Sequence, residues 1–328
     1  MSSEFRTIVD IGKFESNFDV GSRALLLGSC FTDNIGSKFT ENRLNALVNP
    51  FGDIYNPVSI ARLLNRVIEQ HYCDQEELVE QNGLWHHFDF HGRFSGTNKN
   101  EVCANINRTI QECGQFLKSA DFLLLTFGTS FVYERTDTSE IVTNCHKFPS
   151  DFFIRYRLEP EEIITLYKEL IVSLRVFNPG LKIIFTVSPV RHWKDGAHQN
   201  QVSKAALFLA IDKLCEVFEK VWYFPAYEIL MDDLRDYRFY DERMFNPSAV
   251  AVEYIWNRFV NVLFTPRAQK FLQKIEKVKK ARNHRFLHPN AESQRRFAHK
   301  MLRLVDDIEQ EFPEIVLSAD REYFSQWL

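Results

Sequence analysis

Five short apolar runs recur along the chain, and helix-like segments separate most of them. The runs are residues 24–28 (ALLLG), 44–52 (LNALVNPFG), 121–128 (DFLLLTFG), 182–190 (KIIFTVSPV) and 221–229 (VWYFPAYEI). Apolar residues at helical spacing occupy residues 34–42, 57–70, 101–119, 159–177, 201–220 and 246–264. Strands that alternate with helices predict a doubly wound α/β/α sandwich with a mostly parallel five-stranded sheet.

Two aromatic segments of alternating character interrupt this pattern. Residues 83–96 (GLWHHFDFHGRFSG) and 131–147 (FVYERTDTSEIVTNCHK) predict β-hairpins inserted into the sandwich. In doubly wound sheets, ligands bind beyond the carboxyl ends of the strands. Ser29, Gly52, Gly128 and the loop after Val190 each follow a predicted strand, so we expect them on one rim of the sheet.

The first twenty residues and the cysteines bear on the compartment. The N-terminal residues carry charges throughout and contain no apolar core typical of a signal peptide, and no apolar run approaches the ~18 residues that span a bilayer. The six cysteines include no C-x-x-C pair. These features predict a cytoplasmic protein with reduced thiols, no membrane span, no metal site and no cofactor.

Residues 265–300 are strongly basic. They hold 11 Lys or Arg and two Glu, a local charge of +9, so the rest of a chain of net charge −4 sums to −13. An anionic partner such as nucleic acid is one explanation. A solvated helix face is favoured, because Phe271, Ile275 and Val278 form an apolar stripe at helical spacing. We therefore expect a main domain over residues 1–264, a basic helical extension over 265–328 packed on it, and no nucleic-acid partner.

A serine at the end of the first strand is a candidate nucleophile. Ser29 lies where the free N–H groups of a helix start converge, which would stabilise an oxyanion beside the hydroxyl and suits acyl transfer. Alternatively, Ser29, Thr32 or Asp33 caps the helix. Cys30 is a rival nucleophile, but its side chain is expected to point away from that of Ser29.

Several longer phrases resemble those of a known family. GSCFTDNIG, NPFGDIYNP, LLLTFGTSFVYE, NCHK, TVSPVRHWKDG, NQVSKAAL, FPAYEILMDDLRDYRFY and NPSAVAVEYIW occur in one order over residues 5–265 and are similar to those of the bacterial GSCFA domain family. That family is similar to the SGNH (GDSL-like) hydrolases. The resemblance implies an α/β/α sheet with a serine nucleophile after the first strand, and esterase-like chemistry.

The resemblance also implies an oxyanion hole. It makes Ser29 the nucleophile and Gly52 of NPFG the glycine whose N–H, with that of Ser29, binds the oxyanion. SGNH enzymes present an asparagine after the third strand, where this chain has Thr129, whose hydroxyl has less reach.

The usual base of SGNH enzymes is replaced. Relatives carry Asp-x-x-His before the last helix, where this chain has Arg243 and Asn246. The only Asp-x-x-His here is Asp195 to His198, in the loop after residues 182–190. That loop also contains His192, so His198 or His192 is a candidate base, and Arg191 is a candidate ligand for an acidic or hydroxyl-rich substrate group.

The segment WHHFDFH has two interpretations. On a strand, His87, Asp89 and His91 share one face with Trp85, and such a face could hold a metal ion. The favoured interpretation is an aromatic lid over the rim, in which Trp85 stacks on a sugar or covers an acyl group.

Three functions from different classes follow. The first is an esterase or acyltransferase that acts through Ser29 on a small ester, with an acetylated carbohydrate as a candidate substrate. The second is a non-catalytic relative that binds such a ligand, with Asn246 as a contact. The third is an interaction protein that works through the basic segment. The oligomeric state is not readable from these residues.

Overall fold

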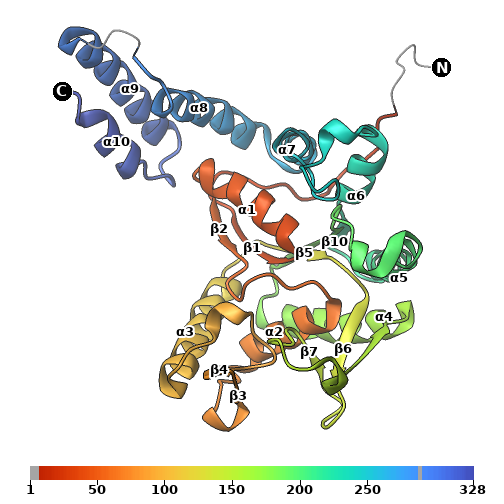
Figure 1. Cartoon of the computed structure of the whole chain (residues 1–328). Helices are drawn as coiled ribbons and strands as arrows, with labels where there is room; N and C mark the ends of the chain where they lie inside the picture. Colours follow the sequence, from red (N-terminus) through yellow and green to blue (C-terminus); the bar gives the residue numbers. More distant parts are fainter. Residues whose placement is uncertain (1–6, 287–289) are drawn as a thin grey trace.

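A five-stranded parallel sheet forms the centre of the structure, a computed structural model that describes residues 7–286 and 290–328 (Figure 1). The strands are β1 (Arg23–Gly28), β2 (Asn45–Val48), β5 (Phe122–Phe127), β9 (Lys182–Val187) and β10 (Val221–Tyr223). Their order is β2-β1-β5-β9-β10, and every neighbouring pair is parallel. The predicted doubly wound α/β architecture is confirmed.

Helices cover both faces of this sheet (Figure 1). One face carries α2 (Pro57–Glu69), α3 (Lys99–Lys118), α4 (Pro160–Phe177) and α5 (Gly196–Val217), and the other carries α1 (Cys30–Glu41) and α7 (Ala249–Leu263). The side chains of β1 alternate between the two cores: Leu25 and Leu27 pack on the first, and Ala24 and Leu26 on the second. Successive residues of a strand point to opposite faces, so a strand buried on both sides is apolar throughout.

The strand order reverses between β1 and β5. From β1 the chain moves outward to β2, then returns to the other side of β1 and continues through β5, β9 and β10. At this switch point Gly28 pairs with Thr126, and the Ser29 N–H donates to the Thr126 carbonyl at 3.2 Å. Ligands of doubly wound proteins bind beside such a point.

Smaller antiparallel units extend from the sandwich. They are the hairpin β3 (Val79–Gln81) with β4 (Leu84–His86), and a sheet of β6 (Phe131–Arg135), β7 (Ile141–Val142) and β8 (Phe153–Arg157). The first hairpin lies earlier than predicted, because Asn82 and Gly83 form its turn with positive φ values of 53° and 76°. An Asn-Gly pair favours this two-residue turn, so the segment after His86 is left outside the hairpin.

Short helical turns complete the connections. They are η1 (Gln75–Glu77), η2 (Gly92–Phe94), η3 (Ser150–Phe152), η4 (Trp193–Asp195), α6 (Ala226–Glu228), η5 (Ile229–Asp233) and η6 (Tyr237–Phe239). The first helix, α1, begins at Cys30 rather than at residue 34 as predicted. The turn between β1 and α1 therefore consists of Ser29 alone.

Three helices follow α7: α8 (Pro266–Arg282), α9 (Ala291–Glu311) and α10 (Ser318–Ser325). The Thr265 hydroxyl caps α8 by accepting the Ala268 N–H at 3.1 Å. Phe271, Ile275 and Val278 are buried, as their spacing predicts. Among the described residues, no helix is both long and apolar enough to cross a membrane.

A buried carboxylate ties these helices to the main sandwich. The Asp320 side chain of α10 accepts two hydrogen bonds from Arg43, both at 2.8 Å, and one from Arg282 of α8, also at 2.8 Å. Asp320 is fully buried. Arg282 is thus not part of a freely solvated face, unlike the exposed Lys277.

Replacing this carboxylate, Asp320→Asn, should lower the free energy of unfolding by about 3 kcal/mol, because two arginines would lose their buried partner. Burial alone would raise the pKa of Asp320, but its hydrogen bonds from Arg43 and Arg282 outweigh burial and lower it. The stabilisation is therefore complete above the unfolded-state pKa of ~3.9 and is lost as pH falls through the lower folded-state pKa. Urea unfolding of wild type and variant from pH 7 down to pH 3 measures both effects.

The matched control is Asp306→Asn, which removes an ion pair with Arg321 whose side chains are about half exposed. Pairs of this kind contribute less than about 1 kcal/mol. Equal effects of the two substitutions would contradict a special role for Asp320.

Candidate functional site

A cavity of about 860 Å³ opens at the carboxyl ends of the central strands. Its walls come from the start of α1, the loop before α2, the β6–β8 sheet and the loops before α5 and α7. The residues that line it are Cys30, Asn34, Tyr55, Asn56, Thr129, Phe131, Tyr133, Val142, Thr143, Arg155, Val190, Arg191, His192, Trp193, Lys194, Asp195, Asp241, Arg243, Phe245, Asn246 and Pro247. We call it the rim cavity.

The thiol of Cys30, and not the hydroxyl of Ser29, belongs to the rim cavity. Ser29 is 1% exposed, and its Oγ is buried without a hydrogen-bond partner among the described residues. Cys30 is half-buried and lines the cavity. The expectation that the Ser29 hydroxyl faces the rim is therefore wrong: because α1 begins at Cys30, this first helical residue faces the rim cavity and Ser29 is buried.

The surroundings of Cys30 keep its thiol protonated. Burial raises its pKa, and the nearby carboxyl groups of Asp53 and Asp33 raise it further. The backbone N–H groups of Cys30 and Phe31 have the opposite effect, because they favour the thiolate at the helix start, but burial dominates. Attack by this sulfur would require a neighbouring group to accept its proton.

Asp33 and Asp53 themselves form a carboxyl pair beside Cys30. The Asn49 amide donates to Asp33 Oδ1 at 2.8 Å and to Asp53 Oδ1 at 3.4 Å. Partial burial, together with the Asp53 carboxyl, raises the pKa of Asp33 to about 6. Asn49 also accepts the Gly28 N–H at 2.9 Å, so this pair is anchored to the end of β1.

The predicted oxyanion donors have different environments. The Gly52 N–H donates to the Asn49 carbonyl at 2.8 Å, so it is already engaged in a turn. Its φ is +86°, and a Cβ at this position would lie 2.6 Å from the Cβ of His91, which explains the glycine without a catalytic role.

Thr129 lines the rim cavity as predicted for the end of the third strand. Its Oγ1 lies 3.0 Å from the Ser203 Oγ and accepts the Phe131 N–H at 3.1 Å. The Ser203 oxygen already accepts the N–H and the O–H of Ser130, at 2.8 and 3.1 Å, so Ser203 donates its own proton to Thr129. The Thr129 proton is then available to a ligand.

Of the two candidate histidines, only His192 lines the rim cavity. Its ring packs edge-on against Tyr55, and burial, with the nearby Lys204 ammonium, lowers its pKa to about 4. The imidazole is therefore neutral at pH 7 and able to accept a proton. His198 is exposed in the first turn of α5, and Asp195 forms an ion pair with Arg155. The Asp195–His198 pairing is wrong, because the helix start directs His198 into solvent.

Arg191 presents an incompletely satisfied guanidinium to the rim cavity. Its Nη2 contacts the Met231 sulfur at 3.3 Å, and its Nε is buried without a partner among the described residues. A buried donor of this kind favours an acceptor supplied by a ligand. The predicted role of Arg191 in ligand binding stays a prediction.

Sequence reasoning missed Lys204. This residue of α5 is 1% exposed, and its Nζ donates to the carbonyls of Gly128 and Ser188, both at 2.7 Å. Burial lowers the pKa of Lys204 to about 7. Through its two hydrogen bonds, Lys204 links the ends of β5 and β9 below the rim cavity. The sequence signal that could have identified Lys204 is its position one turn before Leu207, on the buried side of α5.

The loop before α7 contributes polar groups instead of the usual acid–base pair. Asn246 and Arg243 both line the rim cavity. The Asn246 amide donates to Asp241 Oδ2 at 2.9 Å, and the Asp241 N–H donates to the Asn246 carbonyl at 2.8 Å. Asn246 is thus held in place by Asp241 but offers no basic atom.

The segment that contains Trp85 does not cover the rim cavity. Trp85 lies on β4 beside α3, where the Lys99 ammonium is 3.9 Å from its ring centroid. Phe88 and Phe90 are buried. The aromatic lid is therefore wrong, because this segment packs into the core beside α2 instead of folding over the rim.

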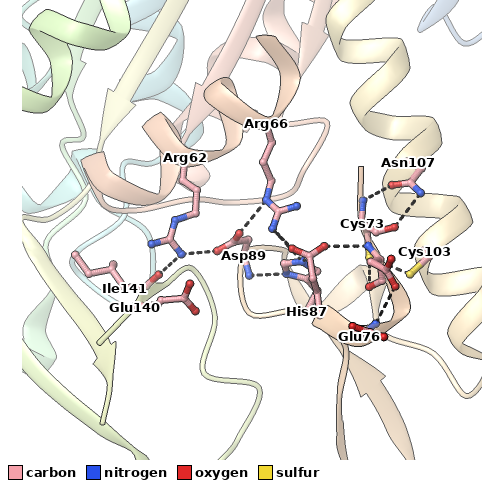
Figure 2. Close-up of polar contacts among 12 residues, drawn as sticks. Arg62, Arg66, Cys73, Glu76, His87, Asp89, Cys103, Asn107, Glu140 and Ile141 are labelled. Carbon is pink, nitrogen blue, oxygen red and sulfur yellow. Dashed lines mark hydrogen bonds and ion pairs between the residues drawn. The ribbon is translucent and has the colours of Figure 1, made fainter. Parts of the chain in front are cut away.

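His87 and Asp89 of this segment contact Arg62, Arg66 and Glu77 (Figure 2). We call these five residues the ion-pair cluster. Asp89 accepts hydrogen bonds from Arg62 at 2.8 Å and Arg66 at 3.0 Å, and Arg66 also donates to Glu77 at 2.6 Å. The Arg62 Nη1 additionally donates to the carbonyl of Ile141, whose neighbour Val142 lines the rim cavity.

Cys73, Glu77 and His87 approach one another closely enough to hold a metal ion. The His87 Nδ1, however, accepts the Asp89 N–H at 3.1 Å, which leaves the proton of the neutral ring on Nε2, facing Glu77 at 3.5 Å. A metal at Nε2 requires the opposite tautomer. These contacts fit an ion-pair cluster better than a metal site.

Comparisons with known proteins give one strong likeness. The model of the GSCFA family matches residues 23–259, and that of the GSCFA domain protein, C-terminal domain, matches residues 275–328. No curated protein sequence matches the chain significantly.

Two solved structures have weak overall similarity. One is a carbohydrate esterase of family 3 from Talaromyces cellulolyticus, with TM-score 0.33 and 10% identity, over 78% of this chain and 99% of that one. The other is an acetyl xylan esterase from the rumen bacterium Butyrivibrio proteoclasticus, with TM-score 0.30 and 17% identity, over 75% and 66% of the two chains. Both TM-scores are too low for either likeness to bear on the activity of this chain.

Proposed function

We propose that this chain, which belongs to the GSCFA family, is an esterase or acyltransferase that uses the Cys30 thiol. The substrate is a small ester, with an acetylated carbohydrate as the candidate. The observation that carries the proposal is the position of Cys30, at the start of α1 and on the wall of the rim cavity.

Cys30 has the surroundings that acyl transfer needs. A helix start offers free backbone N–H groups to an oxyanion, and those of Cys30 and Phe31 already act on the sulfur. Thr129 supplies a further hydroxyl donor. His192 is neutral and lines the same cavity, so it is the proposed proton acceptor.

In the proposed reaction, the Cys30 sulfur attacks the ester carbonyl carbon while its proton passes to His192. The tetrahedral intermediate collapses to a thioester, and the leaving alcohol takes the proton from His192. Water or an acceptor hydroxyl then attacks the thioester and gives its proton to His192. The C–S bond breaks, the Cys30 sulfur takes the proton back from His192, and the acyl group leaves as the acid or as a new ester.

The walls of the rim cavity suit a hydroxyl-rich ligand. Tyr55 and Trp193 are 38% and 47% exposed and offer faces for stacking on a sugar ring. Arg191 has a buried Nε without a partner, and Asn246 is held in place by Asp241. We propose that Arg191 and Asn246 contact the ligand's oxygen atoms.

Replacing the proposed proton acceptor, His192→Ala, should lower kcat/KM for p-nitrophenyl acetate by ~10²-fold or more, the usual contribution of general-base catalysis. In wild type, the rate should fall only as pH drops through about 4, where His192 gains its proton. An ordinary histidine would give this fall near ~6.5. Initial rates from pH 3.5 to 8, within the range where the protein stays folded, measure the profile.

The matched control is His198→Ala, which should leave the rate and its pH profile unchanged because His198 is exposed outside the cavity. A loss of activity in His198→Ala with none in His192→Ala would contradict the assignment of the base.

A non-catalytic binding role is the second candidate. It is favoured by the raised pKa of Cys30 and by the presence of Arg243 and Asn246 where related enzymes carry an acid–base pair. Thermal stabilisation of the wild-type protein by acetylated sugars, without any turnover of p-nitrophenyl acetate, would support binding alone over hydrolysis.

A further inference from the structure

Two buried thiols lie side by side outside the rim cavity. The Sγ atoms of Cys73 and Cys103 are 2.9 Å apart, and both residues are almost completely buried (Figure 2). A disulfide bond is ~2.05 Å long, so the two sulfurs need to move by less than about 1 Å to bond. Cys103 lies on α3, and Cys73 lies in the loop between α2 and η1.

The backbone on both sides of this thiol pair is already fixed. Asn107, one turn after Cys103 on α3, accepts the Cys73 N–H at 2.7 Å and donates to the Cys73 carbonyl at 3.2 Å. Two hydrogen bonds therefore hold the main chain of Cys73 against α3. Forming a disulfide would need little further ordering of the loop.

The residues that flank Cys73 in the chain face solvent. His71, Tyr72 and Asp74 are exposed, whereas Cys73 between them is buried. Burial, with the Cys103 thiol close by, raises the pKa of Cys73, so its thiolate is scarce at neutral pH. Reaction at this pair is expected to be slow at pH 7 and faster at alkaline pH.

We propose that Cys73 and Cys103 are a modification site at which a small-molecule disulfide, such as oxidised glutathione, forms a reversible protein disulfide. One thiolate attacks the small disulfide and releases one thiol. The second thiolate then attacks the mixed disulfide and releases the other. The protein loses two hydrogens, and one small disulfide becomes two thiols.

This bond would close a ring over the chain from Cys73 to Cys103. The ring contains the β3–β4 hairpin and Asp89, whose carboxylate binds Arg62 and Arg66. A cross-link that closes a ring of this length restricts the unfolded chain. Oxidation should therefore stabilise the segment that supports the ion-pair cluster.

The test uses the full-length protein, incubated with oxidised glutathione at pH 8.5. We expect the intact mass to fall by two hydrogens, peptide mapping to link Cys73 to Cys103, and Tm to rise by roughly 5 °C and return on reduction. Cys73→Ser and Cys103→Ser should each abolish the cross-link and the Tm shift. Cys215→Ser, a change at a half-buried cysteine on α5, should keep both.

The Tm of each variant is measured before and after incubation with oxidised glutathione, so a change in its basal Tm does not obscure the response to oxidation. Stable glutathione adducts without the cross-link, or no reaction at either thiol, would overturn the proposal. A cross-link that leaves Tm unchanged would contradict the inferred stabilisation. Turnover of p-nitrophenyl acetate is not part of this readout, so the result is independent of the proposed activity.

Discussion

Cys30→Ala should abolish ester turnover, with a loss of kcat/KM of at least ~10³-fold, whereas Ser29→Ala should keep most of the activity. Removing the nucleophile of a covalent mechanism eliminates its chemical step, and such losses are among the largest known for single substitutions. The contrast arises because the Ser29 side chain is buried while Cys30 lines the rim cavity. Initial rates with p-nitrophenyl acetate measure both variants.

Chemical labelling provides an independent check on this contrast. Iodoacetamide should alkylate Cys30 and inactivate the wild-type protein, and a bound ester should slow both processes equally. A fluorophosphonate should not label Ser29. Loss of turnover in Ser29→Ala, with Cys30→Ala fully active, would restore the serine as the nucleophile and contradict the proposed thiol mechanism.

Gly28→Ala should be the most destabilising single-methyl change on the rim, lowering the free energy of unfolding by about 4 kcal/mol or more. A Cβ on Gly28 would lie 2.3 Å from the Thr126 carbonyl oxygen and 2.8 Å from the Thr32 Oγ1. Its φ of +150° is also unfavourable for any L residue. Neither the backbone of β5 nor the start of α1 is free to move away. Urea unfolding followed by circular dichroism measures the effect.

Gly83→Ala is the matched control for backbone conformation. Gly83 has a φ of +76° in the β3–β4 turn, but no atom lies within 4 Å of an added Cβ. Gly83→Ala should lower the free energy of unfolding by only about 1 kcal/mol, which is the penalty of a positive φ for an L residue alone. Similar effects of the two changes would show that the close approach of β1 to β5 is not what requires a glycine at position 28.

The Gly28→Ala substitution and the two Cys30 experiments concern the same turn, between β1 and α1. Gly28 allows β1 and β5 to approach closely, and Ser29 is the only residue between the strand and α1. The helix start, with Cys30 as its first residue, is thereby fixed at the edge of the rim cavity. Loosening the turn with Gly28→Ala should therefore also reduce the reactivity of Cys30 in any molecules that fold.

The architecture was predictable because it depends on periodic burial. Strands such as β5, buried at every position, are apolar except for Thr126, and helices such as α4 repeat apolar residues every three or four positions. These patterns are local. The family was also predictable, because a long series of sequence motifs can be compared without knowledge of the fold.

The sequence predicted which segments meet at the site, but not which side chains face it. The rule for parallel sheets correctly brought Thr129, Arg191, His192 and the end of β1 together, since carboxyl ends of parallel strands share one edge. Which side chain of the Gly28-Ser29-Cys30 turn faces that edge was not predictable. It depends on the residue at which α1 begins, and one position along a helix rotates a side chain by ~100°.

The sequence by itself determined the parallel sheet, the helices on its two faces and the rim at which polar residues gather, because each follows from local periodicity and strand direction. Only the tertiary structure decided that Cys30 replaces Ser29 on the cavity wall, that His198 faces solvent, that Lys204 is buried under the rim and that Cys73 meets Cys103. The first two depend on the residues at which α1 and α5 begin, and the last two depend on which segments meet in the folded chain. Apolar periodicity alone determines neither.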